Sequence, residues 1–348
     1  MNRDYSLIGE ESRRAVERGL SQAQWYRTEV PRKRMKELMQ RRNGPAIRDT
    51  LLWIGLLVLF GGLGVYLWFS VWSLLCFAVY GVLYGSASDA RWHECGHGTA
   101  FKTRWMNTVV YNLACFMIMR DPTVWRWSHA RHHTDTIIVG RDPEIVAHRP
   151  PALGRIAADF LGLISVPMAF RHMAVHASGR LTAEEKTFIP ESEWPKTFWT
   201  ARIWLLIYAV VVAACVVSGS VLPAMVIGLP RMYGAWHHLV TGLTQHSGLA
   251  DDVTDHRLNS RTVYMNPVTR FVYWNMNYHV EHHMYPMVPF HALPALHAEI
   301  KDDLPEPCAS IPAAFREFGP VLLRQRKEPE YFIHRQLPDR ASSVGSST

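Results

Sequence analysis

The longest apolar stretch of the chain predicts a pair of membrane-spanning helices. No Asp, Glu, Lys, Arg or His occurs between Thr50 and Ser88. With a rise of about 1.5 Å per residue, one helix of this length would be about twice as long as the ~30 Å hydrocarbon core of a bilayer. We therefore expect two spans, near residues 50–69 and 71–88, joined by a tight turn near Ser70.

A second apolar stretch predicts two further spans. It is free of charged side chains and histidine from Ile203 to Pro230 and is interrupted by a Ser-Gly-Ser sequence. We expect a third span near residues 201–218 and a fourth near 221–243. Because the fourth contains Arg231, and an arginine is costly in lipid, this side chain should face protein or a polar cavity.

The distribution of charge predicts the orientation of these spans. Residues 1–48 contain twice as many Lys and Arg as Asp and Glu, whereas the two predicted turns contain none of them. The positive-inside rule therefore places the N-terminus in the cytoplasm, and four crossings return the remaining polar segments to the same side. We expect three regions: a basic cytosolic segment (1–48), a membrane domain (49–300) whose cytosolic cap comprises 89–200 and 244–300, and a cytosolic C-terminal segment (301–348) whose tail, 341–348, is disordered.

Composition excludes several other classes of protein. Hydrophobic residues make up 48% of the chain and charged residues 19%, so intrinsic disorder is excluded. The five cysteines are scattered without a CxxC pair, which excludes a disulfide scaffold. No nucleic-acid-binding module is present. Histidine is the outlier, with 18 residues.

Three clusters of histidine predict a metal centre. They read HxxxH at 93–97, HxxHH at 129–133 and HxxHH at 279–283. On a helix, residues i, i+3 and i+4 project into one arc of about 100°, so several ring nitrogens can approach one point. Eight imidazoles are too many for one zinc ion, which takes about four ligands, and they suit two metal ions. These eight are His93, His97, His129, His132, His133, His279, His282 and His283.

The first cluster also matches another metal motif. His93, Glu94 and His97 read HExxH, the helical zinc site of many metalloproteases. A protease would leave both HxxHH clusters unexplained. The motif also follows the second predicted span instead of lying within one. We therefore disfavour this interpretation.

Around these clusters the chain resembles the membrane fatty acid desaturases of the integral-membrane desaturase/hydroxylase superfamily. Three stretches carry the resemblance: HECGHGTAF at 93–101, WRWSHARHHTDT at 125–136, and NMNYHVEHHMYPMVPFHALPAL at 275–296. Their order relative to the predicted spans also matches. The resemblance extends over about residues 45–300.

The resemblance implies a fold, a cofactor and partners. The expected fold class is an all-α membrane protein with four transmembrane helices and a cytosolic helical cap that holds a histidine-rich, non-haem di-iron site. The eight clustered histidines would be iron ligands, and His246 best matches a ninth that the family often has.

O₂ would be a co-substrate, and a lipid or acyl chain would be the substrate. A separate ferredoxin, rubredoxin or cytochrome with its reductase would supply electrons, because the chain has neither a cytochrome b5-like HPGG segment nor a cysteine cluster. The expected location is the bacterial inner membrane, with both termini and the active site cytoplasmic.

We expect three carboxylates near the clusters to support the predicted ligands. Glu94 and Glu281 lie between predicted ligands, and we expect their carboxylates to accept hydrogen bonds from the ligand rings, as we do for Asp89. The remaining histidines include His172 and His176, which we expect to be surface or packing residues.

The motifs leave four functions open. The first is an acyl-lipid desaturase. The second is a hydroxylase or other oxygenase on the same scaffold, acting on a lipid or a smaller catabolic substrate. The third is a zinc-dependent membrane hydrolase, and the fourth a non-catalytic membrane metal sensor. Loss of a second hydrogen distinguishes the first from the second, and the motifs do not reveal how a substrate is seated.

Overall fold

A computed structural model describes residues 3–338 of the chain, and the regular secondary structure of this part is helical. The predicted disordered tail, 341–348, lies outside the described residues. Between residues 3 and 338 the only β-type pairings are isolated bridges, Thr262 with Tyr278 and Val263 with Cys308. The helices, in chain order, are α1 (Glu10–Glu17), η1 (Leu20–Gln22), α2 (Arg32–Leu38), α3 (Asn43–Tyr66), α4 (Val71–Gly85), α5 (Ala87–Gly96), α6 (Arg104–Met117), α7 (Pro122–Thr134), α8 (Leu153–Asp159), α9 (Ser165–Ala177), η2 (Glu185–Thr187), η3 (Glu191–Glu193), α10 (Trp194–Ser218), α11 (Leu222–Val226), α12 (Pro230–Tyr233), α13 (Trp236–His246), α14 (His256–Asn259), α15 (Pro267–Tyr273), α16 (His279–Met284), α17 (Leu293–Ile300), η4 (Lys301–Asp303) and α18 (Ile311–Gln325).

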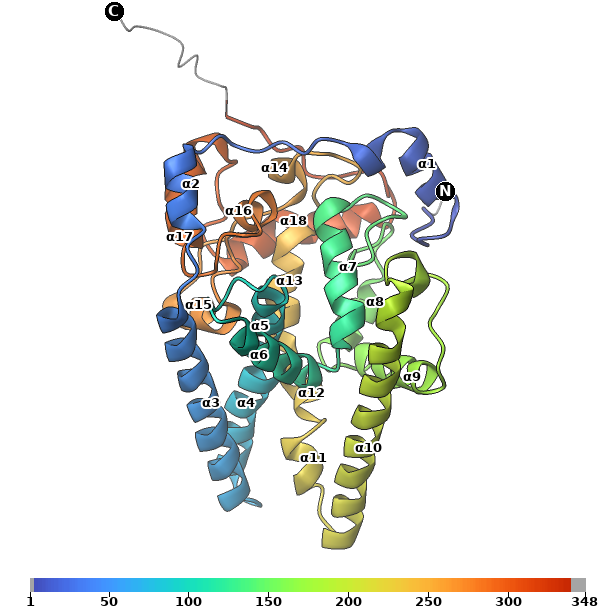
Figure 1. Cartoon of the computed structure of the whole chain (residues 1–348), viewed down its shortest axis with the longest axis vertical. Helices are drawn as coiled ribbons and strands as arrows, with labels where there is room; N and C mark the ends of the chain where they lie inside the picture. Colours follow the sequence, from blue (N-terminus) through green and yellow to red (C-terminus); the bar gives the residue numbers. More distant parts are fainter. Residues whose placement is uncertain (1–2, 339–348) are drawn as a thin grey trace, which may run out of the picture.

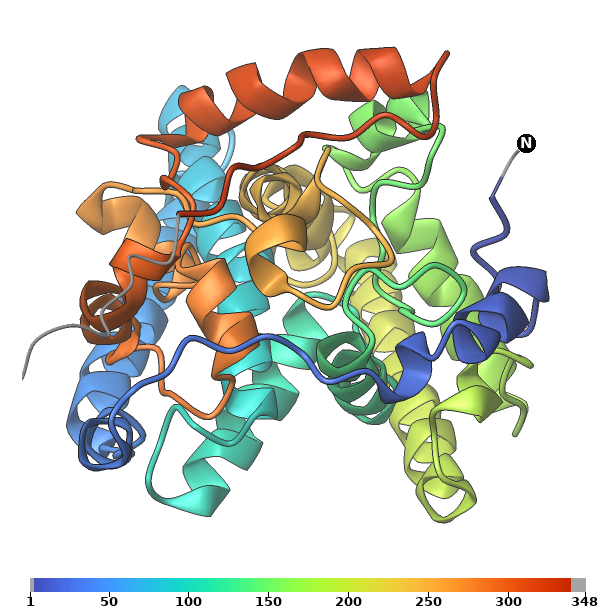
Figure 2. The same ribbon diagram turned by 90° about the horizontal axis from the view of Figure 1, so that it is seen from above.

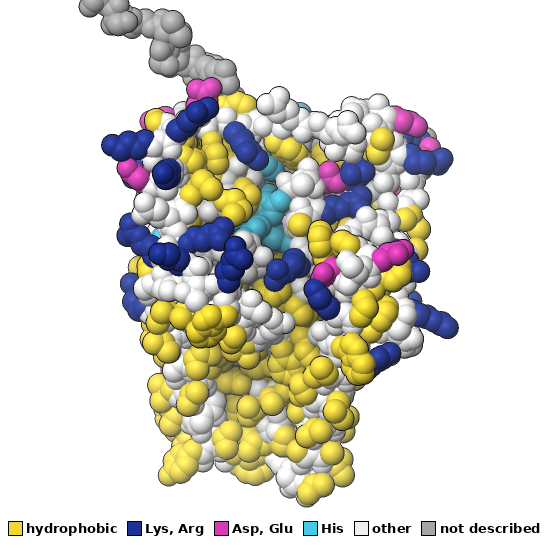
Figure 3. Space-filling model, viewed as in Figure 1, with side chains coloured by type: hydrophobic (Ala, Val, Ile, Leu, Met, Phe, Trp, Pro, Cys, Tyr) yellow, Lys and Arg dark blue, Asp and Glu magenta, His cyan; other side chains and the backbone are white. Residues whose placement is uncertain are grey.

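Three long apolar helices project from one side of a broad helical cap (Figure 1). Within residues 3–338, the helices long and apolar enough to cross a bilayer lie in Arg32–Tyr66, Val71–Gly96 and Glu191–Ser218. On the face shown in Figure 3, hydrophobic side chains cover the outer surface of these helices, and charged side chains lie on the cap. Phe69 and Val217, for example, are 94% and 89% exposed. Apolar surface of this extent suits lipid, so the chain is a membrane protein and the first three predicted spans are confirmed as apolar helices.

The turn between the first two apolar helices is as tight as the sequence predicts. α3 ends at Tyr66 and α4 begins at Val71. The hydroxyl of Ser73 donates a 2.8 Å hydrogen bond to the carbonyl of Gly64, which satisfies a polar group at this apolar end of the molecule. The two helices therefore form an antiparallel pair (Figure 1).

The segment predicted as the fourth span, near residues 221–243, is not one continuous helix. The segment forms α11, α12 and α13 in succession, which lie one above the other between α4 and α10 (Figure 1). Proline lies in the first turn of both α11 and α12, where its missing N–H costs nothing, and Gly228 between them has φ +98°. The chain still runs from the apolar end back to the cap, but in three short helices.

Arg231 has the protein-facing environment that its position predicts. It is 5% exposed, and its Nε donates to the carbonyl of Ile118 at 3.1 Å. A terminal nitrogen donates to the hydroxyl of Ser165 at 3.3 Å. These partners replace part of the hydration that the guanidinium loses in an apolar setting. The expectation that this arginine avoids lipid is confirmed.

The broken segment packs against α4 through glycine. A Cβ on Gly234 would overlap the carbonyl group of Gly81. The hydroxyl of Ser86 also donates to the carbonyl of Gly234 at 2.8 Å. Only a residue without a side chain allows the two backbones to approach so closely.

We expect Gly234→Ala to destabilise the protein by more than about 2 kcal/mol, because the added methyl forces α12–α13 away from α4. Gly55→Ala is the matched control: Gly55 lies within α3, and a Cβ there meets no atom within 4 Å. That variant should be as stable as the parent or slightly more stable. Apparent melting temperatures in detergent measure both, and equal values for the two variants would contradict the packing argument.

The cap brings distant segments of the chain around one centre. Seen from above, α7, α13 and α16 lie near the middle, α18 lies along one edge, and the N-terminal segment passes across the cap on the opposite side (Figure 2). This segment is fixed to the cap by side chains: Trp25 Nε1 donates to the carbonyl of Thr134 at 3.0 Å, and Tyr26 donates to Asp303 at 2.6 Å. The N-terminal segment therefore covers the end of the helices that carry the histidine clusters.

Candidate metal centre

Nine histidines gather at the centre of the cap in two adjacent groups. In each group, one nitrogen from every ring lies within 4.8 Å of those of the other members. Group one contains His93, His97, His129, His133 and His282, and group two contains His132, His246, His279 and His283. These are the nine residues that the sequence and the family resemblance single out.

Four helical segments supply these rings. α5 and the residue after it carry the HxxxH cluster, α7 and α16 carry one HxxHH cluster each, and α13 ends at His246. The start of α7 is fixed by Asp121, whose carboxylate accepts hydrogen bonds from the backbone N–H groups of Thr123 and Val124, with Pro122 at the first helical position. The helix thus begins two turns before its histidines, so that they lie on regular helix.

Each HxxHH cluster divides its histidines between the two groups. On α7, His129 and His133 belong to group one and His132 to group two. On α16 the assignment is reversed, since His282 belongs to group one and the other two to group two. α7 and α16 therefore each contribute to both halves of the paired centre.

The Nε2 atoms converge in a way that neutral rings alone do not favour. In group one, the Nε2 atom of His129 lies 3.1 Å from those of His97 and His133. In group two, the Nε2 atom of His279 lies 2.9 Å from that of His246 and 3.0 Å from that of His283. Lone pairs on neighbouring nitrogens repel, whereas a cation at about 2.1 Å from each nitrogen gives similar separations.

Four rings have a polar contact at Nδ1, the ring nitrogen that faces away from the centre, and this contact fixes the orientation of the ring. His132 donates to Asp142 at 2.8 Å and His129 to Glu144 at 3.0 Å. His246 donates to the carbonyl of Asn259 at 2.8 Å. The fourth is His283, whose Nδ1 lies 3.3 Å from the hydroxyl of Thr136, which itself donates to the carbonyl of His132. A proton held on Nδ1 leaves the lone pair on Nε2, which faces the centre.

Burial keeps most of these rings in the neutral form that binds metals. It lowers the pKa of His129 well below the ordinary value, and the neighbouring His133 adds to the effect. Burial also lowers the pKa of His246 to about 3. His132 is the exception: burial favours its neutral form, but Asp142 outweighs burial and raises its pKa. A neutral imidazole needs no deprotonation before it can bind a cation.

The donor set fits two metal ions. Five nitrogens converge in one group and four in the other, and the His133 and His283 ring centroids, one from each group, are 4.6 Å apart. Fe, Zn, Cu and Ni all accept imidazole ligands. The geometry therefore supports a pair of transition-metal ions at one buried site.

Comparison with known proteins gives the family. The model of the fatty acid desaturase family matches residues 67–314, which is more than half of the chain and includes all nine histidines. The chain belongs to the fatty acid desaturase family. It is also 31% identical over 124 residues to the omega-6 fatty acid desaturase, endoplasmic reticulum isozyme 1, of Glycine max. That match covers 31% of this chain and 31% of the Glycine max protein, so it compares only part of either.

Three predicted contacts to these histidines are wrong. One oxygen of Glu94 accepts hydrogen bonds from the Thr99 hydroxyl and the Phe290 backbone instead of a ligand ring. Glu281 contacts His297 and Thr262. Asp89 forms an ion pair with Arg120 and accepts a hydrogen bond from Trp92. Glu94 and Glu281 lie between the histidines on the same helices, so they point away from the face that carries the rings. Asp89 lies one turn before His93, and Arg120 and Trp92 occupy its carboxylate instead.

The carboxylates that do contact the rings come from a loop that sequence reasoning missed. Asp142 and Glu144 follow α7 in the chain, ten and fifteen residues after the histidines they contact. The chain turns back after α7, partly because the backbone N–H of Ile137 donates to Asp142 at 2.8 Å. Two acidic residues shortly after a histidine cluster are the only sequence signal, and it is common in loops.

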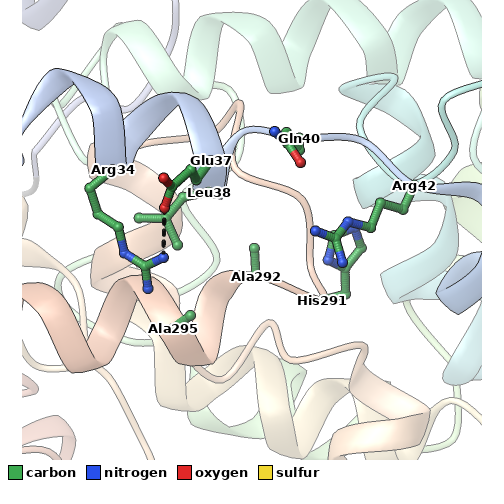
Figure 4. Close-up of a pocket in the computed structure, with 8 residues that line it drawn as sticks. All are labelled: Arg34, Glu37, Leu38, Gln40, Arg42, His291, Ala292 and Ala295. Carbon is green, nitrogen blue, oxygen red and sulfur yellow. Dashed lines mark hydrogen bonds and ion pairs between the residues drawn. The ribbon is translucent and has the colours of Figure 1, made fainter.

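A separate pocket of about 360 Å³ lies at the surface of the cap, between α2 and α17 (Figure 4). Arg34 lies at one end and forms ion pairs with Glu37 at 3.2 Å and Glu299 at 2.6 Å. Arg42 and His291 lie beside each other at the other end (Figure 4). None of its lining residues belongs to the two histidine groups, so this pocket is distinct from the metal centre.

Proposed function

We propose that this protein is a membrane enzyme that desaturates the acyl chain of a lipid, with a non-haem di-iron centre, O₂ and electrons from a separate donor. The observation that carries the proposal is the convergence of nine ring nitrogens in two adjacent groups in a member of the fatty acid desaturase family. No side chain removes hydrogen from an unactivated C–H bond, and a metal centre can.

The proposed ligand assignment follows the two groups. The five histidines of group one would hold one iron ion and the four of group two the other. His246 would thus be a ligand of the second ion. When bound, the two ions supply oxidising power from O₂ and two electrons.

The protein's own residues hold and shield the centre in this proposal. Asp142 and Glu144 keep the Nδ1 protons of His132 and His129 in place, so that both Nε2 lone pairs face inward. The ring of Trp92 lies 5.4 Å from that of His129 and 5.6 Å from that of Trp125. The two tryptophan rings exclude water from one side of the centre and offer an apolar surface to an acyl chain.

The proposed topology has four crossings of the membrane. The three apolar helices form three of them, and the broken segment 221–243 forms the fourth. The excess of basic residues before Asp49 favours a cytoplasmic cap, with both termini and the active site on the same side. The bacterial inner membrane is the proposed location, and the regions 1–48, 49–300 and 301–348 retain their proposed roles.

An external electron donor is part of the proposal. The five cysteines are free and scattered, which argues against a built-in iron–sulfur centre. On the face shown in Figure 3, histidine side chains are visible at the bottom of a hollow, and Lys and Arg side chains surround it. This arrangement favours an acidic ferredoxin, rubredoxin or cytochrome that docks on the cap and passes electrons to the centre.

Metal content, oxygen uptake and product mass test the proposed function together. The purified protein should contain about two iron ions per chain and should consume O₂ only when a reductase system and an acyl lipid are present. The product should weigh two hydrogens less than the substrate. A product that gains one oxygen would instead support a hydroxylase on this scaffold. Zinc with turnover that needs no reductant would support a hydrolase, and a metal-loaded protein inert with every donor would support a sensor.

A further inference from the structure

We propose that His172, His176 and Glu185 form a third metal site, separate from the nine histidines, which binds one Zn²⁺ ion and stabilises the cap. One ligand atom from each of the three residues lies within 4.8 Å of the other two. The Nε2 of His176 lies 3.0 Å and the Nδ1 of His172 lies 3.2 Å from the same carboxylate oxygen of Glu185.

Helical spacing and a neighbouring turn create this arrangement. His172 and His176 are four residues apart on α9, so their rings lie on one face of the helix. Glu185 comes from η2, eight residues after α9 ends. Two histidines at i and i+4 with a carboxylate from another element form a donor set that Zn²⁺ commonly accepts, with a fourth position left for water.

Two of the three proposed ligands are buried, and the third is accessible to solvent. His176 is 2% exposed and Glu185 is 5% exposed. The side chain of His172, in contrast, is 42% exposed. An ion can therefore arrive from solvent past His172 and be held by the two buried groups.

The carboxylate of Glu185 is held in place independently of the histidines. Its second oxygen accepts a 2.8 Å hydrogen bond from the backbone N–H of Thr182, and the Thr182 hydroxyl accepts one from the backbone N–H of Glu185 at 3.2 Å. This reciprocal pair has the hydrogen-bond pattern of a capping box. The first oxygen faces both rings, and the second also lies 3.1 Å from the Nε2 of His176.

The site is connected to the helix that carries the second histidine cluster. Arg131, which lies between His129 and His132 on α7, donates to the hydroxyl of Thr187 at 2.9 Å. On the other side of the same turn, Glu184 accepts a hydrogen bond from the backbone N–H of Leu7 at 3.2 Å. A metal ion at Glu185 would tie the turn to α9 and would thereby support both α7 and the N-terminal segment. The role we infer is structural, because none of the three ligands belongs to the two histidine groups.

Zinc titration of the intact protein tests this site. The full-length protein in detergent, already loaded with iron, should take up about one Zn²⁺ per chain, and its apparent melting temperature should rise on zinc addition. Glu185→Gln and His172→Ala should each weaken zinc binding by at least about tenfold and remove the rise in melting temperature. Iron content and turnover should stay as in the parent, which separates this test from that of the proposed function.

Glu184→Gln is the matched control, because Glu184 adjoins Glu185 and does not belong to the three-residue group. It should bind zinc as the parent does. His172→Ala guards against misfolding, since this half-exposed side chain can be removed without opening the core. If both ligand variants bound zinc as tightly as the parent and Glu184→Gln, the three residues would form only a hydrogen-bonded ion pair and the proposal would be overturned.

Discussion

Replacing His132 with alanine is expected to abolish turnover and to lower the iron content from about two ions per chain toward one. His132 belongs to group two, and its ring is fixed by Asp142 at 2.8 Å. Without its nitrogen, group two retains three rings. Elemental analysis of the purified variant measures the loss of metal, and product formation with a reductase system measures the loss of activity.

His148→Ala is the control for this experiment. His148 is exposed and its ring stacks on that of Tyr5 at 3.9 Å, well outside both histidine groups. This variant should retain iron and turnover. Parent-like turnover in His132→Ala would remove this residue from the proposed ligand set, whereas an equal loss in both variants would point to general damage to the fold.

Asp142→Asn is expected to weaken iron binding by about 10- to 100-fold. Asp142 accepts the Nδ1 proton of His132, and the negative charge makes the ring a better donor through Nε2. The same oxygen accepts a hydrogen bond from the backbone N–H of Ile137, and the other oxygen accepts one from the backbone N–H of Glu144 at 2.8 Å. An amide offers only one acceptor oxygen, so asparagine cannot make all three contacts. Iron titration of the metal-free protein measures the affinity.

Two further measurements distinguish a positioning role of Asp142 from a purely structural one. If the residue acts through His132, excess iron should restore much of the turnover of Asp142→Asn, and the metal-free variant should melt close to the metal-free parent. Asp135→Asn is the matched control: Asp135 forms ion pairs with Arg141 and Arg131 and contacts none of the nine histidines. Unchanged iron affinity in Asp142→Asn, or the same loss in Asp135→Asn, would contradict the proposed role.

The positions of the apolar helices could be predicted because their cause is local. A run without charge from Thr50 to Ser88 is too long for one crossing and long enough for two, whatever the rest of the chain does. The broken segment could not be predicted as such. Apolarity extends from Val221 to beyond Gly228, but proline positions and the close contact of Gly234 with Gly81 decide where the helix stops. That contact joins residues about 150 positions apart.

The histidine clusters, too, could be predicted only in part from the sequence. Spacing alone places three rings of an HxxHH cluster in one arc of a helix, and it indicates correctly that many nitrogens converge. It does not reveal that His132 and His133, which are neighbours in the chain, belong to different groups. That division depends on where α13 and α16 lie relative to α7.

The sequence by itself determined the apolar spans, the histidine spacing and the family, because each depends on residues close together in the chain. Only the tertiary structure decided which carboxylates support the rings, and it replaced Glu94 and Glu281 by Asp142 and Glu144. It also joined His172 and His176 to Glu185. The physical reason is that a side chain's partner depends on how the backbone turns between distant elements, and residue spacing records only the direction in which each side chain leaves its own helix.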